Sequence, residues 1–489
     1  MSNDAQTDPS LDSGPVAPDG VSGDWHEARR RRRMLEGCWT EDLNEILREE
    51  YALALRQNLG VTRTTKNLFR SAVSQLAVIY DRPAIVGVPG EAEGSETLRD
   101  ILDDGGLWQL AQGFSQKVIG MRECAYRFAV HEGDDGPFLQ VLIVPRDLFH
   151  AIAHPDTPDE PHTFYHYRAR TKDEVRDESG NIAQKQKTIW TRDCLSIADP
   201  ENPVYRIESD DGTEDLSAYS FGGVVIPTEW PDQWRKANGA PILPISLYHA
   251  VRTTKLTDSQ TGKELVDGSL IVSARLMQWG HILRDVATPQ RATMDAEFIG
   301  PLQIDASTGT ATATLDAGSI MPFKSTNPGT PGKFHQWDPG GDPVQFINSI
   351  FMYAADVLAD FDIKPSEIAR THTDARSGYA ISINREGERA AQRRYEPSFM
   401  RGDIRSCQIV AAMWNRTTGS SLPEKGWKVK YPGLPLSLEE KKLLLEEHKM
   451  RSELKASSRP ILIAALEGIT EDAARDRARQ IDADIREFG

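Results

Sequence analysis

The sequence predicts an α+β protein, and three patterns lead to this prediction. Apolar residues recur at helical spacing in several long stretches, above all between Asp342 and Asn415. From Met121 to about Trp190 the period of the pattern changes to two, which is typical of strands. Residues 290–341 are rich in glycine and proline and separate two long helical patterns. A chain of 489 residues is too long for one compact core, so we expect several domains or one elongated subunit.

The overall charge argues against one class of function. The formal net charge is -16 and the sequence pI is about 5.3. A protein that coats DNA without sequence preference needs many contacts between Lys or Arg and phosphate, which this balance does not favour. The acidic net charge is still compatible with a small basic surface that contacts DNA. The four cysteines are far apart in the sequence, which excludes a zinc ribbon and a CxxC motif and favours a reducing compartment: Cys38, Cys124, Cys194 and Cys407.

The first 35 residues predict a disordered N-terminal arm. Residues 1–24 are rich in Ser, Asp, Pro and Gly, with five aspartates and no Lys or Arg, which is the reverse of a secretory signal. The run Arg29 to Arg33 has two interpretations, a solvated helix start and a nucleic-acid contact, and we favour the solvated helix start. The longest aliphatic runs, such as Val141 to Val144, are far too short to span a bilayer.

Residues 36–265 begin with helices and continue with strands. The helical pattern covers 41–56, 61–80 and 97–120. Strands with turns between them are predicted at Glu123–His131, Phe138–Val144, Phe164–Arg170 and Lys187–Thr191. The segment from Asp199 to Asp232 contains nine acids and a single base, Arg206, and we expect it to face solvent.

Two long helices flank the region of altered composition. The first covers Val266 to Ala287 and ends at Thr288-Pro289. Between the helices lie Gly-Pro pairs and short strand-like pieces, at 298–304, 310–315 and 319–323. If the flanking helices run antiparallel, each spans roughly 30 Å and the small β-rich insert lies at the far end of the pair.

The second long helix begins at Asp342-Pro343, where proline is favoured in the first helical position, and ends before Pro365. Its apolar stripe is wider than a two-helix hairpin can bury, so we expect it to contact another copy of the chain. A polar segment follows at 370–378, and a further helical pattern runs from Tyr379 to Asn415.

The region from Lys364 to Arg416 holds 10 basic and 6 acidic residues in an otherwise acidic chain. Ion pairs on a solvated helix face explain such a surplus, and so does a surface that faces a polyanion. The chain closes with charged helices. Ser437 and Glu440 form a capping box for the first of them, and 457–466 and 470–488 follow.

The sequence carries no fingerprint of catalysis. Phosphate loop, GxSxG and HExxH motifs are absent. The pairs His150/His154 and His162/His166 have the spacing of metal ligands on a helix, but prolines break the first region and the second has a strand pattern. We therefore expect structural histidines. No catalytic residue, cofactor site or metal site is predicted, and we expect the protein not to be an enzyme.

Several stretches resemble the portal proteins of tailed bacteriophages. Asn67–Pro83 is similar to the N-terminal portal helix that precedes a Tyr-x-x-Pro, and Ala317–Asp342 is similar to the junction between clip and stem. Ser377–Ala380 looks like the exit of the tunnel loop, and Ile469–Ile485 resembles crown endings. The order of parts from about Asn44 onward is the strongest element of the resemblance.

The resemblance implies an elongated portal-type subunit with a mixed α/β wing, a two-helix stem, a β-rich clip, a long wing helix and a helical crown. The parts are the arm (1–35), wing (36–265), first stem helix (266–288), clip (289–341), second stem helix (342–363), tunnel loop (364–378), long wing helix and return (379–430) and crown (431–489). The tunnel loop would face DNA through Arg370, His372, Asp374, Arg376 and Ser377.

The implied function is a ring, typically a dodecamer, that forms the DNA channel at one capsid vertex during genome packaging, retention and ejection. Its implied partners are other copies of itself, double-stranded DNA, the terminase, the major capsid protein and a head-tail adaptor at the clip, with no membrane. The implied location is the virion, and the host cytoplasm during assembly. Two alternatives stay open at this point: a metal-dependent DNA-processing enzyme, and another capsid or head-tail structural protein.

Overall fold

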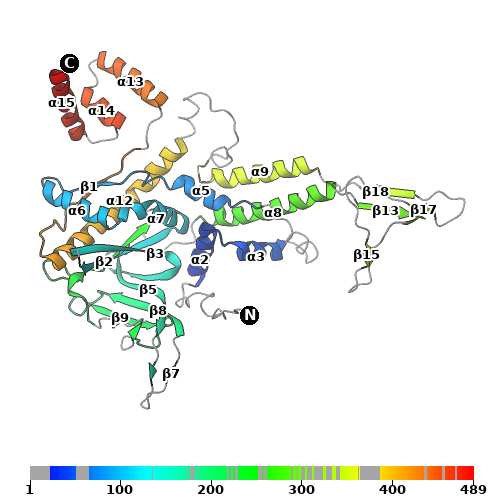
Figure 1. Ribbon diagram of the computed structural model, residues 1–489, viewed down its shortest axis with the longest axis horizontal. Coiled ribbons are helices and arrows are strands. Elements are labelled where there is room, and N and C mark those ends of the chain that lie inside the picture. The colour runs from blue at the N-terminus through cyan, green and yellow to red at the C-terminus, as the bar shows by residue number, and fades with distance from the viewer. Residues whose placement is uncertain are drawn as a thin grey trace. The chain divides into compact units, whose positions relative to one another are not determined.

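The computed structural model divides the chain into two compact units (Figure 1). The first comprises Met1–Trp39, Leu68–Val266 and Phe361–Gly489, and the second Thr40–Asn67 and Asp267–Asp360. Each unit is described by itself. The structure describes residues 22–50, 65–134, 136–172, 175–176, 182–184, 187–216, 220–221, 224–225, 229–251, 256, 262–287, 290–294, 296–298, 303–304, 311–312, 323–325, 333–337, 342–361, 363, 386–433, 438–453, 458–467 and 471–488.

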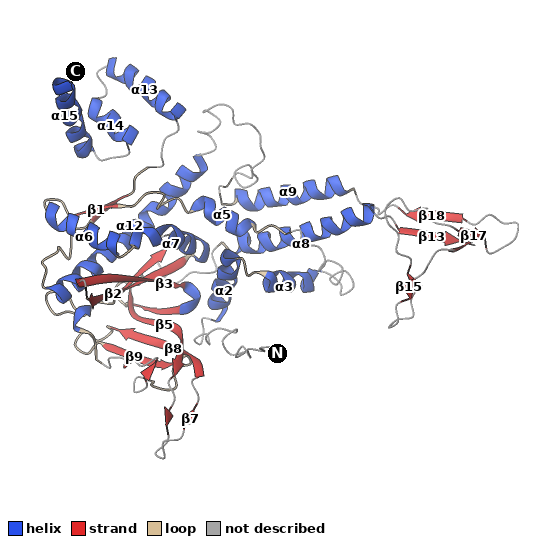
Figure 2. Ribbon diagram, viewed as in Figure 1, coloured by secondary structure: helices blue, strands red, loops and turns tan. Residues whose placement is uncertain are grey.

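The first unit combines helices with antiparallel sheets (Figure 2). Its helices are α2 (Ser22–Glu36), α5 (Leu68–Leu76), α6 (Ala92–Asp104), α7 (Leu107–Met121), η1 (Arg146–Leu148), η2 (Asp232–Trp234), α12 (Glu386–Thr418), α13 (Leu438–Glu453), α14 (Arg459–Glu467) and α15 (Glu471–Phe488). Its strands are β1 (Ile85–Gly87), β2 (Glu123–Gly133), β3 (Gly136–Pro145), β4 (Phe149–Ala153), β5 (Pro161–Lys172), β6 (Val175–Arg176), β7 (Ile182–Gln184), β8 (Lys187–Ser196), β9 (Val204–Ser209), β10 (Ser220–Phe221), β11 (Val224–Val225), β12 (Ile245–His249) and β19 (Lys428–Lys430).

A three-stranded sheet, in the order β12-β2-β3, lies at the centre of this unit. Its register pairs Ser246 with Tyr126, so Tyr248 lies on the same face as Tyr126. Helices α7 and α12 cover this face. Phe114 of α7 stacks on Tyr126 with ring centroids 3.7 Å apart, and Phe399 of α12 packs edge-on against Tyr248. The aromatic side chains thus join both helices to one sheet face.

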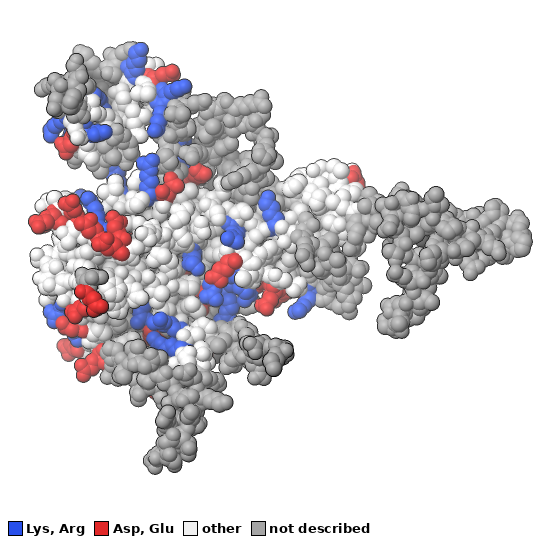
Figure 3. Space-filling view, viewed as in Figure 1, with Lys and Arg blue, Asp and Glu red and all other residues white. Residues whose placement is uncertain are grey.

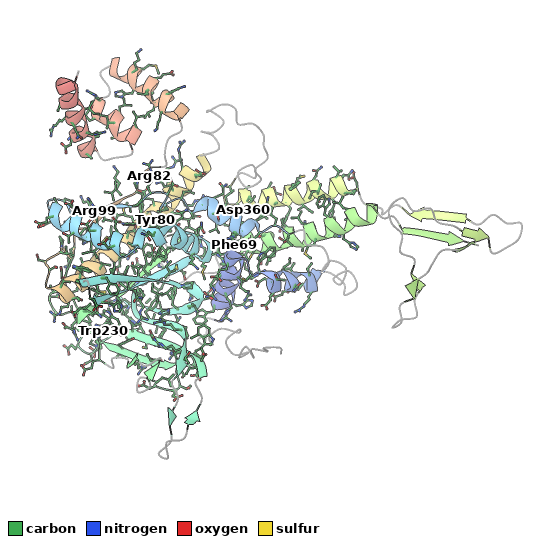
Figure 4. All side chains as sticks on the ribbon, in the orientation of Figure 1. Phe69, Tyr80, Arg82, Arg99, Trp230 and Asp360 are labelled. Carbon is green, nitrogen blue, oxygen red and sulfur yellow. The ribbon has the colours of Figure 1, made fainter. Side chains whose placement is uncertain are left out.

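A buried carboxylate lies among these rings. Asp403 of α12 accepts hydrogen bonds from the hydroxyl groups of Tyr80 (2.8 Å), Tyr248 (2.7 Å) and Tyr431. Tyr80, labelled in Figure 4, follows α5, while Tyr431 directly follows β19. Burial raises the pKa of the Asp403 carboxyl to about 6, although the three hydroxyl donors act in the opposite direction. Segments from three distant parts of the sequence therefore converge on one group.

The opposite face of β2 carries a second buried charge. Arg127 of β2 donates to Asp193 of β8 at 2.6 Å, and Arg170 of β5 lies 2.6 Å from the other carboxylate oxygen. Burial acts to raise the pKa of Asp193, but the two guanidinium groups hold it well below its usual range. The six-stranded sheet, in the order β11-β10-β5-β8-β9 with β4 on β5, is thereby joined to the three-stranded sheet.

The predicted disordered arm of residues 1–35 is too long, because residues 22–36 form helix α2. The run of arginines is also not a solvated helix start. Arg31 is buried, lies 2.8 Å from Glu27 one turn earlier and donates to the carbonyl of Gly120. Arg32 lies 3.2 Å from the buried Asp147. Nearby acids compensate these cations and let the helix pack on α7 and η1.

Other elements follow the sequence with local corrections. The strands predicted around 123–131, 138–144, 164–170 and 187–191 are confirmed as β2, β3, β5 and β8. The single helix expected at 97–120 is wrong: Gly105-Gly106 divides it, and Gly106 adopts a left-handed φ of 68°. The acidic segment 199–232 is not wholly solvated, because Glu208 is buried between Arg192 and Arg206.

The second unit is built on a helical hairpin. Its elements are α3 (Thr40–Glu50), α8 (Lys263–Ala287, which begins in the first unit), β13 (Gln290–Met294), β14 (Ala296–Phe298), β15 (Gln303–Ile304), β16 (Ala311–Thr312), β17 (Phe323–Ser325), β18 (Lys333–Trp337) and α9 (Pro343–Ala359). The helices predicted at Val266–Ala287 and from Asp342-Pro343 are confirmed. The Asp342 side chain caps α9 by accepting from the Val344 N–H at 2.9 Å.

Helices α8 and α9 run antiparallel. A Cβ on Gly268, near the start of α8, would lie 2.8 Å from the Val357 side chain near the end of α9. Further along, the Trp279 indole donates to the carbonyl of Pro343 at 3.1 Å. The segment between the helices forms nested antiparallel pairs, β13 with β18, β14 with β17 and β15 with β16. This two-stranded ribbon confirms the predicted β-rich insert and therefore lies between the adjacent ends of the two helices.

The C-terminal residues form helices, as the sequence predicts. Ile463 of α14 packs with Ala474 and Ala478 of α15 in a small buried cluster. Within the part of the chain that the structure describes, no helix has the length and apolarity needed to cross a membrane. The four cysteines are all free thiols.

Gly402 tests the packing of α12 on β12. A Cβ at this position would lie 2.4 Å from the buried ring of Tyr248, so Gly402→Ala should lower the free energy of unfolding by about 1–3 kcal/mol. The matched control is Gly113→Ala in α7, where a Cβ meets no atom within 4 Å. That variant should gain about 0.5–1 kcal/mol, because alanine favours helix more than glycine. Urea unfolding of both variants measures the difference, and equal effects would contradict the described contact.

Asp403 predicts a specific pH dependence of stability. Its pKa is higher in the folded chain than in the unfolded chain, so the folded state binds the proton more tightly. This contribution should fall by about 3 kcal/mol as the pH rises from 4 to 6 and then level off. Asp403→Asn cannot titrate. The difference in unfolding free energy between wild type and variant should therefore change over this window, and a difference that is constant from pH 4 to 7 would contradict the assignment.

Candidate functional site

The five residues predicted to face DNA lie outside the described part of the chain. They are Arg370, His372, Asp374, Arg376 and Ser377. The described chain stops at Ile363 on one side and resumes with α12 at Glu386 on the other. The predicted tunnel loop therefore stays a prediction, and the described residues indicate a different candidate surface.

That surface is the apolar face of α9. Val344 is 64%, Phe351 58% and Met352 70% exposed, although all three are large apolar residues. They recur at intervals of seven or eight residues, which places them along one side of the helix. Single exposed apolar residues are common on protein surfaces, but an aligned set of this kind is typical of an interaction surface.

The buried side of the same helix faces its neighbour. Ile350, Ala354, Val357 and Leu358 are buried within the second unit. Arg275 of α8 lies over the ring of Tyr353, 4.9 Å from its centroid, and adds a cation-π contact. The helix is thus fixed on one side, and the face with Phe351 and Met352 is left open.

Almost no charge interrupts this surface. The sequence of α9 contains a single ionisable acid or base of the Asp, Glu, Lys and Arg types, Asp356, and the described surface over α9 is largely white in Figure 3. On α8, Leu283 is also 38% exposed. Two helices of one hairpin therefore expose apolar side chains, and contact with a partner would remove them from water.

Two arginines of α12 form ion pairs with other residues of the first unit. Arg401 pairs with Asp159 and Glu160 of the loop before β5, and Arg416 binds both oxygens of Asp232. These ion pairs connect α12 to loops that are distant in the sequence. They are not pairs between residues of the same helix. For these two arginines the structure therefore favours ion pairing over a surface that faces a polyanion.

The histidine pairs lie on or beside strands and not on a helix. His162 and His166 lie in strand β5, as predicted, and His150 lies in β4. Burial, reinforced by the Arg127 guanidinium, lowers the pKa of His166 well below its usual range, so this imidazole is neutral and contacts Arg127 at 3.0 Å. Among the described residues, no group of three or more His, Cys, Asp and Glu side chains is arranged to hold a metal ion.

Comparisons with known proteins give limited similarity. No protein-family profile matches the sequence, and no curated protein matches it. Among solved structures, the chain is similar to one from the neck of an empty gene transfer agent particle computed with C6 symmetry, at 12% identity and a TM-score of 0.42, with 94% of this chain and 98% of that chain covered.

It is also similar to a chain from the virion of a native gene transfer agent particle, at 13% identity and a TM-score of 0.36. A third is a chain from the neck of a native particle computed with C12 symmetry, at 12% identity and a TM-score of 0.39. Both comparisons cover 82% of this chain and 89% of the other. Because a TM-score below 0.5 does not establish a common fold, the proposals below depend on the chain's own residues.

Proposed function

We propose that this chain is the repeating subunit of a portal ring, the DNA channel at one vertex of a phage-like capsid. The single observation that supports it most strongly is the antiparallel α8–α9 hairpin, with a β ribbon between its helices and an uncovered apolar face on α9. The sequence resemblance to portal proteins supports the same arrangement of parts. In this proposal the hairpin is the stem and the ribbon of β13–β18 is the clip.

The remaining parts follow the order of the chain. We assign residues 36–265 to the wing, and we add helix α2, which was predicted to be part of the disordered arm. Residues 379–430 are assigned to the long wing helix and the segment that follows it. Residues 431–489 form the crown and 364–378 the tunnel loop. The proposed partners are the head-tail adaptor at the clip, the major capsid protein around the wing, the terminase during packaging, and the DNA itself. The mature location is the virion, after assembly in the host cytoplasm.

The exposed apolar residues support a ring over an isolated subunit. Phe351 and Met352 lie on α9, whereas Leu283 lies on α8. A contact between two different surfaces of one subunit is heterologous, and such contacts close into rings when the rotation permits. The β ribbon agrees with this reasoning, because an isolated two-stranded ribbon is marginally stable in water. Neighbouring subunits would cover both elements.

The charge of the chain suits a channel that does not retain DNA. Each subunit carries a formal net charge of -16, so a ring of many copies is strongly acidic. Affinity for DNA grows with the number of cation-phosphate contacts, and an acidic wall avoids their accumulation. In the proposed ring, Arg370 and Arg376 of the tunnel loop provide a small number of contacts in each copy. The chain itself is proposed to catalyse no reaction, and the motor is a separate protein.

Removal of the apolar face of α9 should prevent assembly. Wild-type protein should sediment as a large oligomer, whereas the double variant Phe351→Ser/Met352→Ser should sediment as a monomer. Because both side chains are more than half exposed, the unfolding free energy of the monomer should change by no more than about 0.5 kcal/mol per site. Analytical ultracentrifugation with circular dichroism on the same samples measures both effects.

The matched control is Leu445→Ser/Met450→Ser on α13, which removes two exposed apolar side chains of similar size. It should leave the oligomer intact. Assembly of the α9 variant at wild-type level, or equal loss of assembly in the control, would contradict the proposed role of this face.

The tunnel loop is tested by charge removal. Arg370→Ala/Arg376→Ala should leave assembly unchanged and reduce DNA packaging or retention severalfold, because repetition around a ring multiplies weak phosphate contacts. The readout is the amount of nuclease-protected DNA per particle. Arg416→Ala is the control, since this arginine already binds Asp232. Full-length DNA held by the double variant as by wild type would exclude the loop as a DNA contact. Metal-dependent cleavage of plasmid DNA by the purified chain would instead favour the enzyme.

A further inference from the structure

The first unit contains a cavity of about 400 Å³ beside α12. One wall is apolar and includes the buried Leu243 and Ile245 and, on α12, Met400 and Ile404. The other wall is polar and includes Arg405, Gln408 and the loop carrying Asp159 and Glu160. The site is thus built for a ligand that combines an apolar group with a polar one.

Arg405 is the unusual group in this wall. It is partly buried, and among the described residues it makes no hydrogen bond and no ion pair within 4 Å. Arg401 forms ion pairs with Asp159 and Glu160, so these carboxylates already have a cationic partner. A guanidinium in such a position is expected to bind an anion.

A second cation strengthens this conclusion. Burial lowers the pKa of Lys236, Arg405 and Lys425 lower it further, and Glu424 and Glu160 act in the opposite direction. Burial also lowers the pKa of Arg405 itself, with Glu160 opposing and Arg401 adding to the shift. A cation held partly out of water, as Arg405 is, is unfavourable, and a carboxylate placed against it would offset the cost.

The surroundings favour a peptide carboxylate over a nucleic-acid phosphate. The apolar wall of Leu243 and Ile404 offers nothing to a phosphodiester backbone but would accept an aliphatic side chain. An aliphatic residue next to an aspartate combines both requirements in one short segment.

The chain contains such a segment at its own N-terminus. Residues 1–21 carry four aspartates and no Lys or Arg, and Leu11 directly precedes Asp12. The segment is therefore complementary in charge to Arg405 and Lys236. Twenty-one residues span up to roughly 70 Å when extended.

We propose that this cavity is a docking site for residues 1–21, with the Asp12 carboxylate on Arg405 and the Leu11 side chain against the apolar wall. The site does not depend on the proposed portal function. It would tether the N-terminal segment, and where the segment reaches a neighbouring copy it would link two subunits without enlarging the hairpin contact.

Photocrosslinking in the full-length chain tests the proposal. Leu11 is replaced by p-benzoylphenylalanine, the sample is irradiated, and the crosslinked peptides are identified by mass spectrometry. Crosslinks should map to Met400, Ile404 and their neighbours. Arg405→Gln and Asp12→Asn should each reduce the yield of these crosslinks at least fivefold. Lys236→Gln, a milder change, should reduce it by a smaller factor.

Three controls make the result decisive. The photoreactive residue placed at Asp4 should not label the cavity, and Lys428→Gln, on the exposed part of β19, should not change the yield. Circular dichroism confirms that each variant is folded. Crosslinks from position 11 that map elsewhere, or that are insensitive to Arg405→Gln, would overturn the proposal. So would an Arg405-dependent increase in the fluorescence anisotropy of a labelled DNA duplex without cavity crosslinks, because it would assign the site to phosphate.

Discussion

The Asp403 carboxylate is buried inside the first unit and accepts hydrogen bonds from three tyrosines that lie far apart in the sequence. Tyr80 follows α5, Tyr248 belongs to β12, and Tyr431 follows β19. A buried carboxylate without these donors would be strongly unfavourable, so the three segments must arrive together. Gly402 permits the close approach, because a side chain there would overlap the ring of Tyr248. The position of α12 on the sheet depends on this arrangement, and so do the ion pairs and the cavity that α12 forms with distant loops.

The second unit follows a different physical rule. Its hairpin is held by apolar contacts such as Gly268 against Val357. Close packing satisfies one side of α9, while Phe351 and Met352 stay in contact with water. The hydrophobic effect therefore favours association at this helix without any directional bond. Specific hydrogen bonds position the elements of the first unit. In the second unit, the uncovered apolar face of α9 favours association with another copy of the chain.

Periodicity and helix-start signals predicted much of the fold, because they are local properties. Asp342-Pro343 marked the start of α9, and the change to period two located β2, β3, β5 and β8. The predicted apolar stripe of this helix also included Phe351, which the structure leaves exposed. Other local predictions were wrong. Gly105-Gly106 divides a predicted helix, and Glu27 and Asp147 stabilise the arginines of α2 within a folded helix.

The long-range features had no signal in a single sequence. Nothing about Tyr80, Tyr248 and Tyr431 separates them from other tyrosines until the fold brings them to Asp403. The same holds for Arg405, whose lack of an ion-pair partner among the described residues depends on where Asp159 and Glu160 lie. The DNA-facing role of Arg370 and Arg376 stays a prediction from the resemblance, because the described residues do not include them.

The central claim is that copies of this chain close into a ring around a channel. Single-particle electron microscopy of the purified full-length chain tests it most directly. The account predicts end-on views with cyclic symmetry and an axial opening wide enough for duplex DNA. A chain that stays monomeric at micromolar concentration, or that forms closed two-fold dimers without an opening, would contradict it.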